Sequence, residues 1–593
     1  MNYCAYTKAI LFLLFFGCSN LLFSATITWE GNVSSDWNDP LNWSPQMVPT
    51  FFDEVIINSS ANNEPTIFSG TTAFAKKVDI TNNQRILTIQ NGGSLTIDGT
   101  GSEKSLTNHG TVENYGILII GTVTENEGLL NSSVFNNYAG GKINIKNSTD
   151  TGIENQGTYN NKAGAEINID EITTGDGIRN DITFNNSGKI NIGLNGKVTG
   201  SGINNRFISV GGFTNNATGE INIDDTGQNG VVNTATFTNS GKINIGANKK
   251  ITGHGIRNDH TFTNNTGGDI NVDDTGLTGV LNLNNAGGFD NSGQINIGQN
   301  KPIGLRGLEN NSGTFNNLMG GEINIDDTAD RGIFTWLTFN NYGKINIGQH
   351  KKINSIGLDN QWTFNNFSQG EINIDDTQIQ GLYNLNFFHN HGKINIGINK
   401  KTGIAVRSGL SNQGFFNNIS GSELHIDETG FYAIHNYSQF DNDGKINIGV
   451  NKKSDNHGIV NRYMFHNKSA GELIIEETGL DGFVNLNADG DSFVHEFTNE
   501  GKIIIGQTKK PTRYAIYSTG NMLNQSCSEM ILFEQLVNVG NAYNDIVNNG
   551  LFSFDTPEPH TPGIFTNNGL IEDIQGTFPM NGSFANNEIV IAP

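Results

Sequence analysis

The chain has 593 residues, with 74 glycines, 11 prolines, 16% charged residues and a formal net charge of −23 at pH 7. Abundant glycine with little proline and moderate charge is typical of a folded, turn-rich β protein and argues against extended disorder. Because such an acidic chain offers no basic surface to phosphates, nucleic acid is excluded as an expected partner.

The first 25 residues have the pattern of a secretory signal. Lys8 precedes an apolar run at 9–16 that is too short to span a bilayer. We therefore predict a signal peptide over 1–25 and a secreted or cell-surface protein. The alternative is that FFGC, ending at Cys18, acts as a bacterial lipobox, so that Cys18 carries a lipid anchor. No later stretch is expected to cross a membrane as a helix.

Residues 26–60 differ in composition from everything that follows. Trp29, Trp37 and Trp43 fall within TITWEGNVSSDWNDPLNWSPQMVPTFFDEVIIN, which carries W-x-G, D-W-N, N-W-S and V-P in series. This series resembles the opening of bacterial exported parallel β-helix repeat proteins, including surface adhesins and autotransporter passengers. The resemblance implies that residues 26–60 form an N-terminal cap. A cap is also required physically, because an uncovered terminal coil exposes its core and its strand edges.

Irregular first coils are predicted over 61–130 and regular repeats over 131–510. The sequence GIRNDITFNNSGKINIG at 177–193 shows the constant order of the repeat: Gly-aliphatic-x-Asn, then Phe-x-Asn, then Gly-x-Ile-x-Ile. An aromatic residue marks each repeat, mostly at intervals of about 24 to 29 residues, the size of one solenoid unit. The recurring aromatic residues are Phe135, Tyr159, Phe184, Phe213, Phe237, Phe262, Phe289, Phe315, Phe339, Phe364, Phe388, Phe416, Phe440, Phe465 and Phe497.

Each of the three elements alternates apolar and polar residues over a few positions, which predicts a short strand. Glycine and asparagine stand at the junctions, where a positive φ is often needed. The fold class is therefore all-β: a right-handed parallel β-helix, or three-sided β-solenoid, with capping segments at both ends. Ile178, Phe184, Ile190 and Ile192 are expected to point inward, and Asn191 outward. Residues 511–593 are predicted to be degenerate closing coils and a C-terminal cap.

The asparagine that follows the repeated phenylalanine is interpreted as a corner ladder whose amides bond from coil to coil. Asparagine commonly bonds to turn backbone, so this structural interpretation is favoured over ligand contact. The residues assigned to the ladder are Asn186, Asn216, Asn265, Asn317, Asn341 and Asn366.

The sequence also has a longer period of about 50 residues, which corresponds to two coils. INIDDTG at 221–227 alternates with INIGANKK at 243–250, so acidic coils alternate with basic ones. Asp224 and Asp225 are expected to lie near Lys249 and Lys250 of the next coil. Exposed ion pairs contribute only about 0.2–1 kcal/mol, so the alternation is interpreted as fixing the register of the coils.

The acidic pairs are candidate sites, because adjacent carboxylates are Ca²⁺ ligands and paired carboxyl groups hydrolyse glycosides. An active site is expected to occur once in a chain, whereas these pairs recur in every second coil. This recurrence favours the interpretation that the pairs fix the register of the coils. No catalytic residue and no cofactor is therefore assigned. The weak calcium candidates are Asp224, Asp225, Asp273, Asp274, Asp326, Asp327, Asp375 and Asp376.

Residues between the first element and the phenylalanine vary most from coil to coil. Successive coils would array them along one side, where aromatic faces stack on sugars or anchor a protein partner. The alternative is that some of them pack locally beneath corner loops. Interruptions near Arg206, Arg407 and Asp489 are predicted to be loops that leave the coil. The predicted binding residues are Phe334, Trp336, Trp362, Tyr383, His435, Tyr437 and Tyr463.

These observations favour a secreted or cell-surface scaffold of adhesin type that binds an extracellular glycan or surface protein without catalysis. One alternative is a polysaccharide-degrading lyase or hydrolase, which rests on analogy between β-helix folds alone. A second alternative is a purely structural surface-layer or matrix protein. The sequence leans away from an enzyme, because no singular arrangement of reactive residues stands out from the repeat.

Overall fold

A computed structural model of the chain describes residues 25–58, 62–98, 104–121, 128–206, 211–403, 408–486, 496–538, 545–555, 560–573 and 581–586. Nearly all of the predicted signal peptide, with Cys18, and the predicted loop positions Arg407 and Asp489 lie outside these residues. The described chain divides into two compact units, 1–169 and 170–593. Within the described residues both units consist of β-strands, and the helical structure is one short 3-10 helix, η1 (Pro40–Asn42).

Unit 1 begins with a buried tryptophan cluster. Strand β1 (Thr26–Trp29) pairs antiparallel with β2 (Trp43–Ser44) and parallel with β3 (Glu54–Ile57). The ring of Trp43 lies edge-on to those of Trp29 and Trp37, with centroids 4.7 and 4.8 Å apart. From β3 onward the strands stack in parallel from coil to coil. The remaining strands of unit 1 are β4 (Thr66–Ile67), β5 (Thr72–Ala75), β6 (Lys77–Ile80), β7 (Ile86–Ile89), β8 (Ser94–Ile97), β9 (Leu106–Asn108), β10 (Thr111–Asn114), β11 (Ile117–Ile120), β12 (Leu129–Asn131), β13 (Val134–Asn137), β14 (Lys142–Ile145), β15 (Ile153–Asn155), β16 (Thr158–Asn161) and β17 (Glu166–Ile169).

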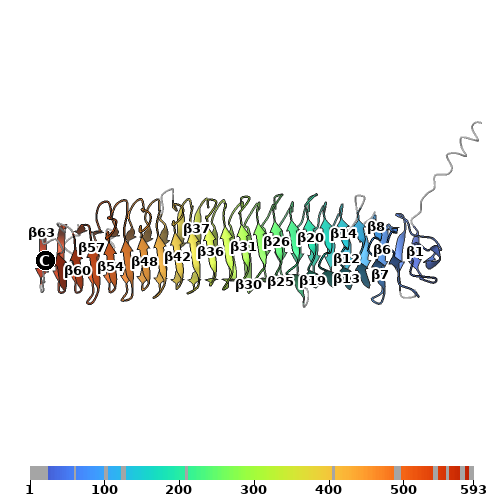
Figure 1. Ribbon diagram of the computed structural model, residues 1–593, viewed down its shortest axis with the longest axis horizontal. Coiled ribbons are helices and arrows are strands. Elements are labelled where there is room, and N and C mark those ends of the chain that lie inside the picture. Colours follow the sequence, from blue (N-terminus) through green and yellow to red (C-terminus); the bar gives the residue numbers. More distant parts are fainter. Residues whose placement is uncertain are drawn as a thin grey trace, which may run out of the picture. The chain divides into compact units, whose positions relative to one another are not determined.

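Unit 2 repeats a coil of three short strands, as predicted. In the first coil these are β18 (Ile178–Asn180), β19 (Thr183–Asn186) and β20 (Lys189–Ile192). Each pairs in parallel register with the equivalent strand of the next coil, so that Ile178 faces Ile203 and Phe184 faces Phe213. Figure 1 shows the third strands β20, β26, β31, β36, β42 and β48 following one another in chain order through unit 2. The three-sided parallel β-solenoid is therefore confirmed.

The further strands of unit 2 fall into three sets and a closing group. The first strands are β21 (Ile203–Asn205), β24 (Val231–Asn233), β27 (Ile256–Asn258), β34 (Ile333–Thr335), β37 (Ile356–Asn360), β40 (Gln380–Asn384), β43 (Leu410–Asn412), β46 (Ile434–Asn436), β49 (Ile459–Asn461), β52 (Phe483–Asn485), β55 (Ile516–Ser518) and β58 (Leu536–Asn538). The second strands are β22 (Gly212–Asn215), β25 (Thr236–Asn239), β28 (Thr261–Asn264), β35 (Phe339–Asn341), β38 (Thr363–Asn366), β41 (Phe387–Asn390), β44 (Phe415–Asn418), β47 (Gln439–Asn442), β50 (Met464–Asn467), β53 (Glu496–Asn499) and β56 (Asn521–Asn524). The longer strands β30 (Val280–Asn291) and β32 (Leu308–Asn317) run through both positions. The third strands are β23 (Glu220–Ile223), β26 (Lys242–Ile245), β29 (Asp269–Val272), β31 (Gln294–Ile297), β33 (Glu322–Ile325), β36 (Lys344–Ile347), β39 (Glu371–Ile374), β42 (Lys393–Ile396), β45 (Glu423–Ile426), β48 (Lys445–Ile448), β51 (Glu472–Ile475), β54 (Lys502–Ile505) and β57 (Glu529–Leu532). The closing strands are β59 (Asp545–Asn548), β60 (Leu551–Phe554), β61 (His560–Asn567), β62 (Leu570–Asp573) and β63 (Asn581–Asn586).

The core of unit 2 is built from columns of like residues. Ile178, Phe184, Ile190 and Ile192 are all fully buried, as predicted. From Phe184 to Phe465 the repeated rings stack with centroids 4.6–5.0 Å apart and planes within 2–14° of parallel. That spacing equals the separation of hydrogen-bonded strands, about 4.8 Å, so each ring meets the next without distortion. Burial of each ring contributes about 1.5–3 kcal/mol.

An asparagine ladder runs beside the aromatic column. The Nδ2 of Asn186 donates to Oδ1 of Asn215, and the Nδ2 of Asn215 donates to Oδ1 of Asn239, each at 2.8 Å. These side chains are fully buried, so the ladder satisfies polar groups that would otherwise be costly inside the coil. Ladder positions predicted from the sequence and confirmed here are Asn186, Asn317, Asn341 and Asn366.

Asn216 and Asn265 also bond to the neighbouring coil, as predicted, but to serine hydroxyls and not within the asparagine ladder. Both stand one residue beyond the ladder, on the corner, where their Nδ2 atoms donate to Ser187 Oγ (3.0 Å) and Ser240 Oγ (2.9 Å). Side chains alternate faces along a strand, so the inward position lies two residues after the phenylalanine and the third residue turns outward. The ladder members in those coils are Asn215 and Asn264.

A second inner ladder, which the sequence analysis did not predict, uses the asparagine that ends the first strand. Asn205 Nδ2 donates to Asn233 Oδ1 (2.7 Å), and Asn233 Nδ2 to Asn258 Oδ1 (2.8 Å). In one coil Thr335 replaces the asparagine and accepts from Asn310 Nδ2 at 3.3 Å. Side-chain ladders therefore fix two of the three corners, and Thr335 interrupts the second ladder.

The double-coil period has a structural basis in the acidic pairs. The buried carboxylate of Asp224 accepts hydrogen bonds from the backbone N–H groups of Asn248 and Lys249 in the next coil, at 3.0 and 3.2 Å. Its neighbour Asp225 has φ +42° and lies 3.8 Å from Nζ of Lys249. The predicted proximity of the acidic pair to the basic turn is confirmed through Lys249.

Candidate functional site

The predicted binding residues lie on the first strands of unit 2 and on the corners that follow these strands. The central outward positions of β34, β37, β40, β43 and β46 are in register and carry Phe334, Asp359, Tyr383, Ser411 and His435. Aromatic side chains thus occupy every second coil of this column, with Asp359 and Ser411 in the coils between them. We call this stretch, from β34 to β49, the aromatic face.

Phe334 is a packing residue of this face. It is only 4% exposed, and the guanidinium carbons of Arg306 and Arg331 lie 4.2 and 4.9 Å from its ring centroid. Both arginines pair with Asp330, and Arg331 also pairs with the buried carboxylate of Asp359. Charged groups therefore cover the ring, which favours the packing alternative for Phe334.

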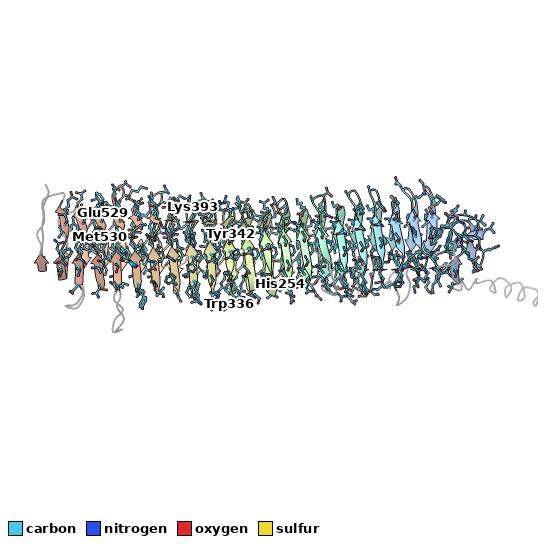
Figure 2. All side chains as sticks on the ribbon, turned by 90° about the horizontal axis from the view of Figure 1, so that it is seen from below. His254, Trp336, Tyr342, Lys393, Glu529 and Met530 are labelled. Carbon is cyan, nitrogen blue, oxygen red and sulfur yellow. The ribbon has the colours of Figure 1, made fainter. Side chains whose placement is uncertain are left out.

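Trp336 and Trp362 project from the same face. They are 51% and 49% exposed, and the Trp336 ring lies edge-on to Phe334 with centroids 5.4 Å apart. Figure 2 shows Trp336 at the edge of the stack opposite to the edge that carries Lys393. Leu385 and Phe387 add further exposed apolar surface in the next coil. Exposed aromatic rings at this density are a recognised feature of binding surfaces.

A cleft of about 410 Å³ opens further along the aromatic face. It crosses four successive coils, and its volume lies within the range of about 300–1,000 Å³ that small-molecule sites occupy. The lining residues are Gln380, Ser408, Ser411, Gln413, Phe431, Tyr432, His435, Tyr437 and Arg462. Two predicted residues, His435 and Tyr437, belong to this lining.

His435 is held neutral and oriented by its neighbours. Nε of Arg462 donates to Nε2 of His435 at 3.0 Å, and the rings of Tyr432 and Tyr437 lie 4.9 and 3.9 Å from the imidazole. Burial, together with the positive charge of Arg462, lowers the pKa of His435 from 6.5 to about 3. Because a guanidinium only donates, Nε2 must be the acceptor, which places the imidazole proton on Nδ1. Burial also raises the pKa of Tyr432.

Gln380 contributes a buried amide to the cleft. Its side chain is 4% exposed, and Oε1 has no hydrogen-bond partner among the residues that the structure describes. A buried carbonyl oxygen without a partner costs about 1–3 kcal/mol, so native proteins rarely tolerate one without a reason. This oxygen is an acceptor that a bound group could satisfy.

Tyr383 and Tyr463 lie beside the cleft. The hydroxyl of Tyr383 donates to Oε1 of Gln413 in the next coil at 3.0 Å, so its side chain reaches the lining. Tyr463 occupies the corner after β49, at the position that Trp362 holds after β37, and is half-buried. Both residues are placed on the predicted face.

The calcium candidates are accounted for by contacts with protein groups. The first aspartate of each pair accepts backbone N–H groups of the next coil, and the second lies 3.8–3.9 Å from a lysine ammonium. Within the described residues, no three histidine, cysteine, aspartate or glutamate side chains come together in a metal-binding arrangement. The contacts favour the register interpretation for Asp224, Asp225, Asp273, Asp274, Asp326, Asp327, Asp375 and Asp376.

Most of the cleft was not predicted from the sequence. Three lining residues each stand two residues before the aliphatic residue of the first strand, whereas the predicted binding residues follow that aliphatic residue. These three are Gln380, Ser408 and Tyr432. The corresponding position holds His254, Arg306 or Asp481 in other coils. The variation at this position from coil to coil could have predicted the remaining cleft residues. It shows that a second position of the repeat, besides those after the aliphatic residue, differs between coils.

Comparison with known protein families assigns part of unit 1. A family model described as a domain of unknown function (DUF8693) matches residues 28–138, within unit 1. No curated protein matches the chain. In the part of the chain that the structure describes, no helix is long and apolar enough to cross a membrane. The cleft and the aromatic face lie in unit 2, outside the matched residues.

Proposed function

We propose that the chain is an exported, adhesin-like scaffold that binds an extracellular glycan on the aromatic face of unit 2. The observation that carries this proposal is the combination of exposed Trp336 and Trp362 with a cleft lined by Gln380, whose buried Oε1 has no hydrogen-bond partner among the described residues. Export is supported by the signal pattern over 1–25.

The chemistry of the face suits a sugar chain. Pyranose rings have apolar faces and a rim of hydroxyl groups, so they need flat aromatic surfaces next to hydrogen-bonding side chains. The aromatic face supplies both, because the amides of Gln380 and Gln413 lie in the two coils between that of Trp362 and that of Tyr437. Successive coils repeat at about 4.8 Å, so an extended ligand would meet several of these groups at once.

Glycan binding is tested with the full mature chain on a glycan array and by affinity electrophoresis in gels that contain neutral or acidic polysaccharides. We expect retardation by at least one polysaccharide. The double variant Trp336→Ala, Trp362→Ala should lose most of this retardation, because each stacked ring contributes a large share of binding energy at such surfaces. Met319→Ala is the matched control, since Met319 is 70% exposed but lies on the corner after β32.

Two results would decide against the proposal. Retardation that is unchanged in the double tryptophan variant would exclude the aromatic face as the binding surface. Release of reducing or unsaturated sugars from the same polysaccharides would instead identify an enzyme, which a scaffold without catalysis cannot explain.

A further inference from the structure

Two histidines lie two residues apart on the outer side of the second strands of unit 2. His389 is the third residue of β41, and His391 directly follows this strand. Phe388 and Asn390 are fully buried, and side chains alternate faces along a strand, so His389 points outward. His391 is exposed. Residues two apart on a strand are separated by about 6.6 Å at Cα, so two imidazole side chains can reach one point between them.

The ring nitrogens of this pair have no hydrogen-bond or ion-pair partner among the residues that the structure describes. Other histidines of unit 2 do have such partners, which fix their rings. These histidines are His254, His350, His425, His435, His457 and His466. The pair therefore differs from them in offering its nitrogens to a further ligand.

Aromatic rings surround the pair. The ring of His389 lies 6.4 Å from those of Phe387 and Phe415, measured between centroids. The ring of His391 stacks with that of Phe367 at 6.1 Å. Burial, together with the positive charge of His391, lowers the pKa of His389 from its ordinary value of 6.5. Metal ions bind the neutral form of imidazole, so at neutral pH His389 is in the form that a metal ion needs.

These side chains have the chemistry of a transition-metal site. Zn²⁺, Ni²⁺ and Cu²⁺ favour imidazole nitrogen, whereas Ca²⁺ and Mg²⁺ favour oxygen ligands. Two histidines supply half of the four ligands that Zn²⁺ takes in most proteins. Within the described part of the chain no third histidine, cysteine, aspartate or glutamate joins them, so water or a bound molecule would complete the coordination.

We propose that His389 and His391 bind one divalent transition-metal ion, which keeps coordination positions open to solvent. The pair belongs to the second strands, whereas the cleft is lined by residues on and around the first strands. The proposal is therefore independent of the proposed function. A metal ion with open positions can accept a further oxygen or nitrogen ligand, so the site adds a second binding chemistry to the surface of unit 2.

The proposal is tested by calorimetry on the full mature chain at neutral pH, with Zn²⁺ and Ni²⁺ as probes and Ca²⁺ for comparison. We expect saturable binding of Zn²⁺ and Ni²⁺ that Ca²⁺ does not displace. His389→Asn and His391→Ser should each weaken this binding about tenfold or more, because each removes one of the two ligands. Both changes introduce residues that other coils carry there. Asn365 and Asn417 are in register with His389. Ser240 holds the corner position of His391 in another coil.

His466→Asn is the matched control. His466 occupies the register position of His389 three coils further along. In that coil Lys468 stands where a second histidine would be needed, and Glu500 pairs with the imidazole. The control variant should bind Zn²⁺ like the wild type. NMR gives a second measurement, because the ring signals of His389 and His391 should shift together when Zn²⁺ is added, and less so as protons compete for the nitrogens at lower pH.

The metal site is overturned if the wild-type chain shows no saturable binding of Zn²⁺. Zn²⁺ affinity that is unchanged in both His389→Asn and His391→Ser would place the metal elsewhere. Equal weakening by His466→Asn would show uptake by single surface histidines instead of a pair. Displacement of Zn²⁺ by Ca²⁺ would identify carboxylates as the ligands. None of these results bears on the binding of glycans by the aromatic face, which is tested separately.

Discussion

The Nδ2 atom of Asn215 donates a 2.8 Å hydrogen bond to Oδ1 of Asn239 in the next coil of unit 2. Oδ1 of Asn215 accepts the equivalent bond from Asn186. Asn215→Ala therefore removes both of these buried hydrogen bonds and deprives Oδ1 of Asn239 of its donor. We expect the free energy of local unfolding to fall by about 1–3 kcal/mol, measured by hydrogen exchange of amides in β19, β22 and β25.

Asn216→Ala is the control for this ladder. Asn216 follows directly in the chain but lies on the corner, where it bonds only to Ser187 Oγ. Its replacement should change the free energy of local unfolding by less than about 1 kcal/mol. Equal effects at positions 215 and 216 would contradict the assignment of the ladder to the buried residue.

Gly246 and Gly267 are required for different reasons: a positive φ together with a close backbone contact at Gly246, and a positive φ alone at Gly267. Gly246 has φ +71°, and a Cβ there would lie 1.9 Å from the backbone oxygen of Asp273 in the next coil. Gly267 has φ +85°, yet a Cβ would meet nothing within 4 Å. Gly267→Ala should cost about 1–2 kcal/mol from the left-handed backbone alone, and Gly246→Ala about 1–3 kcal/mol more. Hydrogen exchange around each site measures both costs, and similar losses would show that the contact with Asp273 relaxes freely.

His435 should make stability depend on pH. Its pKa is lowered to about 3 in the folded chain, against an ordinary value of 6.5. Between these values the unfolded chain binds a proton that the folded chain does not, so the free energy of unfolding falls as pH falls from 6.5 toward 3. The slope for one proton is at most about 1.4 kcal/mol per pH unit.

His435→Gln provides the comparison, because its amide oxygen can still accept from Arg462 but does not titrate. The stability difference between wild type and variant should be constant above pH 7 and should shift against the wild type as acid is added. An NMR titration of the imidazole gives the pKa directly. An imidazole of the folded chain that titrates near 6.5 would contradict the buried, neutral state.

The core was predictable because every coil repeats it. Period-two alternation places Phe184, Ile190 and Ile192 inward, and repetition removes the ambiguity that a single short strand would leave. The same rule, applied strictly, also identifies the ladder asparagine, since Asn215 and Asn264 stand two residues after the phenylalanine. Because Asn215 and Asn216 are adjacent and both follow the phenylalanine closely, the approximate motif did not show which of them belongs to the ladder.

The cleft was not predictable by the same means. Its shape depends on Ser411 lying between Tyr383 and His435, which are 28 and 24 residues away in the sequence. Repeat lengths vary around this point, so the facing residues are known only once the register of the strands is known. The aromatic residues themselves were visible in the sequence, whereas the contacts between coils that form the cleft were not.

Mutations on the aromatic face should distinguish residues that stabilise the fold from residues that bind the ligand. Phe334→Ala removes a ring that is 4% exposed and covered by Arg306 and Arg331, so we expect a loss of about 3 kcal/mol in local stability. Trp336→Ala removes a ring that is 51% exposed and should change stability by about 0.5 kcal/mol or less. The two variants should behave oppositely in affinity electrophoresis at a temperature where both remain folded, because only Trp336 presents its ring to a ligand. Loss of polysaccharide binding by Phe334→Ala alone, with Trp336→Ala unaffected, would place the binding surface elsewhere.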